Sequence, residues 1–189
     1  MADDPLFRIA HDALTFAFAY AGQQFDRSLM LKVASPSAGI GKGLSGLDGA
    51  AQAGMIRREV AALGKVAEAV LMARFAPKTV PCSCGSPCCR KYRDNPEYAN
   101  AIAVLADNMR RTALAGTSAN AITRTACVIR YFTPESKRIS YEDLAKLCSI
   151  HRQSASAYAS RVAGVLLQYD KAAVAVIETN LQAAGVVGE

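Results

Sequence analysis

A short cysteine-rich segment is the first part of this sequence whose residue types could do chemistry. It places four thiols within eight residues: Cys82, Cys84, Cys88 and Cys89. Four thiolates form the usual tetrahedral shell of a structural zinc ion. Gly85 and Pro87 allow the chain reversal that would bring the two pairs of cysteines together. We therefore expect a metal site here, with zinc as the metal.

The spacing of this segment leaves several ligand sets open. A common zinc ribbon uses two Cys-x-x-Cys pairs separated by about a dozen residues or more, whereas here the pairs are Cys-x-Cys and Cys-Cys. Three thiolates with a fourth ligand from His151, His11 or water are one alternative. A proline-rich loop with reduced cysteines, or with one local disulfide, would need no metal.

A second stretch, residues 140–167, has the spacing of a helix-turn-helix unit. Ser140 is predicted to cap a short helix, Ala145 is small enough for two helices to cross closely, and Ile150 would fill the corner between them. The second helix begins at Arg152, and its helical period predicts a buried stripe of Ala155, Ala159 and Val162. The second helix and the basic flank before the unit carry side chains that can contact base edges and phosphates. They are His151, Arg152, Gln153, Ser156, Ser160, Arg161, Lys137 and Arg138. The alternative is an ordinary helical hairpin with a solvated polar face.

Composition and charge narrow the class of partner. The 189 residues include 22 lysines and arginines against 16 acidic residues, a formal net charge of +6, and the isoelectric point is about 9.1. A basic excess of this size favours a polyanion, and double-stranded DNA is the partner that we expect. Hydrophobic residues make up 51% of the chain, enough for a packed core. No apolar run approaches the roughly 18 residues of a membrane span, so we expect no membrane partner.

The N-terminal residues and the cysteines predict a cytoplasmic protein. Acidic residues follow Met1 closely, where a signal peptide would be positively charged. Four of the six cysteines are clustered, whereas a secreted disulfide framework spreads its cysteines along the chain to close loops. Both features are typical of a protein that stays in a reducing compartment.

No catalytic constellation emerges from the remaining residues. His11 and His151 have no obvious acid-base partner close in the sequence. The glycine-rich stretch 39–46 invites comparison with a phosphate-binding loop, but Gly43 stands where the Walker pattern needs serine or threonine. We expect no catalytic residues and no enzyme activity. A metal- or thiol-dependent enzyme is a remote alternative.

The elements that position these residues are predicted to be helical, in an all-α fold. Helices are expected over residues 4–20, 50–63, 66–75, 98–114, 121–132, 140–147 and 152–167. We place a helical bundle at 1–135 and the helix-turn-helix unit at 136–189. Within the bundle, a flexible glycine-rich loop is expected at 35–49 and an irregular cysteine-rich loop at 81–93.

Several stretches read together resemble a known family. They are Gly-Lys-Gly-Leu-Ser-Gly-Leu-Asp-Gly-Ala-Ala-Gln-Ala-Gly-Met at 41–55, Met-Ala-Arg-Phe-Ala-Pro at 72–77, the cysteine segment at 81–89 and the unit at 140–167. In this combination they are similar to a family of prophage-encoded DNA-binding proteins. Members of that family look like Q-type late antitermination proteins of lambdoid phages. The resemblance covers most of the chain from about residue 15 onward.

The resemblance implies a phage or prophage transcription regulator in the cytoplasm of a bacterial host. Such a protein binds DNA near a late promoter, engages a paused RNA polymerase with its σ factor, and suppresses downstream terminators. The resemblance also implies that the C-terminal unit is a module like σ region 4. The lambda-type proteins carry two Cys-x-x-Cys pairs, and residues 81–89 depart from that spacing. A conventional DNA-binding repressor or activator, acting as a homodimer, is the alternative.

Overall fold

The protein is mostly helical, as the sequence predicts. The computed structural model describes residues 6–24, 46–82, 84 and 90–188. This part of the chain contains seven α-helices, one 3-10 helix and two short strands. The elements are α1 (Ala10–Gln24), α3 (Gly46–Ala62), α4 (Lys65–Phe75), β1 (Thr79–Pro81), β2 (Tyr92–Asp94), α5 (Pro96–Arg111), α6 (Ala121–Phe132), η1 (Glu135–Lys137), α7 (Tyr141–Cys148) and α8 (Arg152–Ala183).

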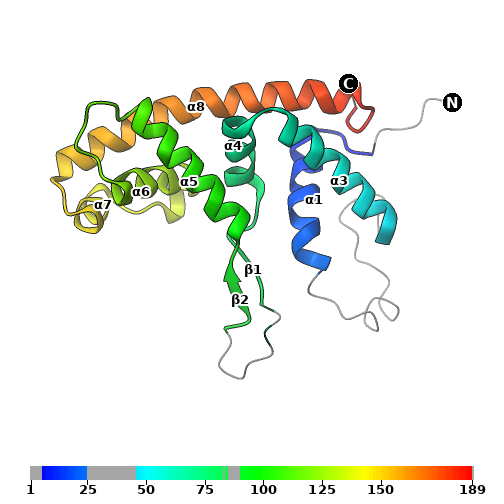
Figure 1. The fold of residues 1–189 in the computed structure, drawn as a ribbon, viewed down its shortest axis with the longest axis horizontal. Helices are drawn as coiled ribbons and strands as arrows, with labels where there is room; N and C mark the ends of the chain where they lie inside the picture. The colour runs from blue at the N-terminus through cyan, green and yellow to red at the C-terminus, as the bar shows by residue number, and fades with distance from the viewer. Residues whose placement is uncertain (1–5, 25–45, 83, 85–89, 189) are drawn as a thin grey trace.

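Helix α8 is the element against which most of the others pack. It has 32 residues and runs along one side of the molecule, with α1, α3, α4, α6 and α7 in contact with it (Figure 1). Its buried residues recur every three or four positions, as one face of a helix requires. They are Ala155, Ala159, Val162, Leu166, Asp170, Ala173, Ile177 and Leu181.

The two predicted units share one hydrophobic core. Residues from α1 to α6 and residues from α7 and α8 belong to the same buried cluster. Near the two ends of the described chain, Phe7 donates a backbone hydrogen bond to Val186 (3.1 Å) and accepts one from Gly188 (3.1 Å). The boundary at residues 135–136 stays a prediction, because α8 packs on elements from both sides of it.

A polar cluster lies inside the contact between α4, α6 and α8. Asp170 is buried in the apolar stripe of α8 and forms an ion pair with Arg74 of α4. The hydroxyl of Tyr131, on α6, donates a hydrogen bond to the same carboxylate (3.2 Å). Burial, and then the charge of Asp170, raise the pKa of the Tyr131 hydroxyl. Arg74 and Tyr131, from two different helices, therefore both bind the buried Asp170.

The starts of the first two described helices differ from the prediction. The first helix begins at Ala10 instead of residue 4, and α3 begins at Gly46, inside the stretch 35–49 that was predicted to be a loop. Gly49 is buried, and a Cβ atom added there would stand 2.8 Å from Cε2 of Tyr20 on α1. Close packing of α3 on α1 therefore offsets the low helix propensity of this glycine. The rest of the predicted loop, residues 35–45, lies outside the described residues.

This packing predicts opposite effects for two glycines of α3. Gly54→Ala is expected to raise the free energy of unfolding by about 0.5–1 kcal/mol, because its added Cβ meets no atom within 4 Å. Gly49→Ala is expected to lower it by about 1 kcal/mol, because the Tyr20 ring must move. Urea unfolding of the two variants measures both values. Equal gains at the two positions would contradict a close packing role for Gly49.

Candidate nucleic-acid interface

Helices α7 and α8 form a hairpin at the position predicted from the sequence. The Ser140 hydroxyl accepts a hydrogen bond from the backbone N–H of Asp143 (3.1 Å) and donates one to the Asp143 carboxylate (2.7 Å), so the predicted cap is confirmed. Ser149 has a left-handed backbone with φ 53° and ψ 46°, and it ends α7. The Ile150 N–H then donates to the Ala145 carbonyl (3.1 Å). The connection between the helices is therefore a tight turn of three residues, 149–151.

The inner faces of the two helices are apolar and buried. On α7 the buried residues are Leu144, Ala145 and Cys148, and on the first part of α8 they are Ala155, Ala159 and Val162. Ile150 is half-buried and packs against this core, as the corner position predicts. The predicted buried stripe of the hairpin is confirmed, and it fixes which residues of α8 face outward.

The outward face of α8 carries the predicted DNA-contacting side chains. His151, Arg152, Gln153, Ser160 and Arg161 are exposed, and Ser156 is half-buried. At 3.6 residues per turn, Gln153 and Ser160 face away from the buried stripe, whereas Arg152 and Arg161 lie on different sides of the helix. The first acidic residue along α8 is Asp170, which is buried and paired with Arg74. The exposed start of α8 therefore carries positive and neutral polar groups without an acid.

The N-terminus of α8 also lacks the usual compensation for its unpaired backbone N–H groups. His151 stands at the N-cap and its side chain makes no capping hydrogen bond, and the first turn contains no acidic residue. Each of the other described helices has an acidic first turn or a side-chain cap. The start of α8 is thus the helix end in this part of the chain that is best suited to an external anion.

The two residues of the basic flank lie in different surroundings. Lys137 is exposed at the end of η1, beside an apolar groove formed by α6 and α7. Arg138 donates from Nε and Nη2 to the Thr133 carbonyl (3.3 and 3.2 Å), which holds its guanidinium near the end of α6. The sequence predicts one basic flank from these two residues, because they are neighbours along the chain. The structure places Lys137 beside the groove and Arg138 against the end of α6.

The cysteine segment leaves the body of the protein on a two-stranded antiparallel ribbon. Residues 81–93 are predicted to be irregular, but β1 and β2 pair from Thr79↔Asp94 to Pro81↔Tyr92. The Cys82 N–H extends this ladder by donating to the Lys91 carbonyl (2.8 Å). Strand pairing continues here because Pro81 lies at the end of β1, where its missing N–H is tolerated. Figure 1 shows the ribbon projecting away from α8.

The structure describes only half of the predicted zinc ligands. Cys82 is half-buried and Cys84 is exposed, whereas Cys88 and Cys89 lie outside the described residues. In the ranges that are described, no three or more histidine, cysteine or acidic side chains gather as a metal site would need. The alternative ligand His11 is on α1, with its ring 5.2 Å from that of Phe75 and Nδ1 3.6 Å from the carboxylate of Asp12. Zinc binding by the cysteine segment stays a prediction.

A thiol titration tests this prediction together with metal analysis. We expect about one zinc per chain after purification without added metal. Cys127 and Cys148 are buried, and burial, with a smaller contribution from Cys148, raises the pKa of Cys127 to about 11. Thiols that react in the folded protein after chelation therefore report the cysteine segment alone. The prediction would be contradicted if the purified protein contains no zinc and the thiols of the cysteine segment react at once, before any chelator is added.

Comparison with known proteins gives no further assignment. No protein-family model matches the chain, and no curated protein matches it. Within the described ranges, none of the helices combines the length and apolar character that a membrane crossing requires.

Sequence reasoning missed one surface feature near the candidate interface. Ile122, Ile129, Ile139 and Leu147 are exposed and line the same groove between α6 and α7. The available signal was that α6 carries apolar residues on more than one face, while only one face of a surface helix is normally buried.

Proposed function

We propose that the protein is a DNA-binding transcription regulator that reads DNA with the start of α8. The observation that carries this proposal is the combination of two features at one helix end. The first turn of α8 has neither an acidic residue nor a side-chain cap, and it exposes His151, Arg152 and Gln153. An end of this kind attracts a phosphate, and the side chains beside it are types that hydrogen-bond to base edges.

The hairpin supports an arrangement in which α8 enters the major groove. The tight turn at 149–151 leaves the first turn of α8 exposed beyond α7, and the inner faces of both helices are buried together. In a helix-turn-helix protein the first residues of the second helix reach deepest, and more distant residues contact the backbone. Arg161 lies nine positions after Arg152, about 13 Å along the helix axis, so we assign it to a phosphate.

The class of regulator rests on the resemblance of the stretches at 41–55, 72–77, 81–89 and 140–167 to Q-type antitermination proteins. We therefore propose a phage antitermination factor that binds DNA near a late promoter and engages RNA polymerase and its σ factor. A conventional repressor or activator would need only DNA and a second copy of the chain. The helix end described above fits either regulator, since both must first bind duplex DNA.

Two measurements separate these functions. Titration against specific and scrambled duplexes at several salt concentrations tests DNA binding, which must weaken steeply with salt if phosphate contacts dominate. A transcription assay with purified polymerase, with and without the upstream site, then tests read-through of a terminator. Read-through that requires the upstream site supports antitermination, whereas altered initiation alone supports the conventional regulator. Absence of duplex binding in low salt would overturn both.

A further inference from the structure

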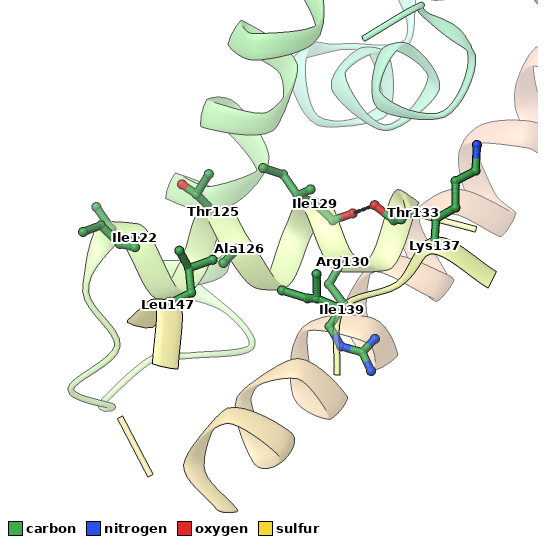
Figure 2. A pocket seen from close by; sticks show the side chains of 10 residues that line it. Ile122, Thr125, Ala126, Ile129, Arg130, Thr133, Lys137, Ile139 and Leu147 are labelled. Carbon is green, nitrogen blue, oxygen red and sulfur yellow. Dashed lines mark hydrogen bonds between the residues drawn. The ribbon is translucent and has the colours of Figure 1, made fainter. Parts of the chain in front are cut away.

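An apolar groove lies on the outer side of α6, where it meets α7. Its walls include Ile122, Ile129, Ile139 and Leu147, which expose 59%, 38%, 40% and 59% of their surfaces. Figure 2 shows Ile122 and Leu147 at one end, Ile129 and Ile139 further along, and Lys137 toward the other end. The groove has a volume of about 410 Å³.

This groove concentrates a large share of the exposed apolar surface. Nine large hydrophobic residues are exposed in the described part of the chain, and four of them line this one groove. Single exposed hydrophobic residues are ordinary, but a contiguous apolar patch on a soluble domain is typical of a site that a partner covers. The remaining exposed apolar residues include Leu167 on α8, outside the groove.

The two charged residues that line the groove are both positive. Lys137 and Arg130 belong to its lining, and neither makes an ion pair among the described residues. The Arg130 guanidinium carbon instead lies 4.3 Å from the centre of the Tyr141 ring. The acids nearest along α7 have partners already: Glu142 pairs with Lys146 (3.0 Å), and Asp143 accepts from Ser140 (2.7 Å). An acidic occupant would therefore meet unpaired cations.

We propose that this groove binds an amphipathic helix of a partner protein, with an apolar face and acidic flanks. The lining residues of α6 extend from Ala121 to Arg130, about 14 Å or two and a half helical turns. That length matches apolar anchors at positions i, i+3 or i+4, and i+7 of a docked helix. A second copy of this chain fits less well, because two basic groove edges would meet in one apolar interface without an acid.

The proposal is independent of DNA reading by α8. Of the groove residues, only Lys137 belongs to the predicted DNA-contacting set, and Ile122 and Leu147 lie on α6 and α7. Failure of DNA binding would leave the groove proposal intact, and failure of helix binding would leave the regulator proposal intact. One set of variants can therefore test the groove proposal and the regulator proposal separately.

The test uses two labelled helical peptides of about 18 residues with the same leucine face. One has glutamates on its flanks and the other has lysines in their place. We expect saturable, micromolar binding of the glutamate peptide to the full chain, and at least about tenfold weaker binding by Ile122→Ser/Leu147→Ser. Lys137→Glu is expected to weaken binding of the glutamate peptide by about threefold to tenfold and to strengthen binding of the lysine peptide.

Matched controls make the outcome decisive. Leu167→Ser removes a hydrophobic residue of similar exposure, 47%, outside the groove, and must bind the peptide like wild type. The double groove variant must keep its helix content and its DNA affinity. Equal weakening by Leu167→Ser, or no saturable binding of the glutamate peptide up to about 1 mM, would overturn the proposal. So would a wild-type dimer in sedimentation that the double groove variant abolishes, because the occupant would then be a second copy.

Discussion

Arg152→Ala is expected to weaken binding to a specific duplex by about 1–3 kcal/mol, roughly fivefold to hundredfold, and to relax the preference at one base pair. Arg152 is the first residue of α8, is exposed, and lies beside backbone N–H groups that no side chain caps. The substitution would delete the base contact that we propose for its guanidinium, and it leaves the buried residues of α8 unchanged. Titrations of wild type and variant against single-base substitutions of the duplex measure both effects.

Arg161→Ala is the matched control for Arg152→Ala. Arg161 is exposed on the same helix but lies about 13 Å further along it, where we assign a phosphate contact. Its loss is expected to weaken binding to all duplexes alike. It is also expected to reduce the slope of log affinity against log salt concentration by about one. If both variants bind like wild type while keeping their helix content, α8 is not the reading element.

Leu144→Ala and Ile177→Ala are each expected to lower the free energy of unfolding by about 2–5 kcal/mol, within one cooperative transition. Both side chains are fully buried, Leu144 on α7 and Ile177 near the far end of α8. The two positions belong to the same hydrophobic cluster, and α8 connects them. Urea unfolding followed by circular dichroism and by tyrosine fluorescence measures the midpoint and tests whether the two signals coincide.

Leu167→Ala is the control for these core substitutions. Its side chain is 47% exposed on the same helix, so its truncation is expected to cost no more than about 0.5–1 kcal/mol. Two separate transitions, with Leu144→Ala shifting one and Ile177→Ala the other, would contradict a single core. That result would instead support independent units at 1–135 and 136–189.

Local sequence signals predicted much of the helical framework, because a helix end is decided by residues close to it. The helix expected from residue 98 begins two residues earlier, at Pro96, where the Asn95 side chain accepts a hydrogen bond from the Glu97 N–H (3.0 Å). Ser140 predicted the start of α7. The bounds of α6 agree with the predicted 121–132. The buried stripe at the start of α8 followed from helical period alone.

Elements that depend on distant partners were not visible in the sequence. Strands β1 and β2 have three residues each, too short for an alternating pattern, and they exist because they pair with each other. The buried Asp170 would be unfavourable in the stripe of α8 without Arg74, which is 96 positions away in the chain. Gly49 was expected in the loop 35–49, and its close packing against Tyr20 in the structure is likewise tertiary.

For the candidate interface, the sequence by itself determined which residues of α8 face outward and that the chain is basic. Helical period and net charge are enough for both conclusions. Only the tertiary structure decided that the first turn of α8 is left exposed by its neighbours, that Lys137 and Arg138 lie in different surroundings, and that α6 and α7 leave an apolar groove. The reason is physical: a residue's exposure depends on which other elements cover it, and those elements are distant in the sequence.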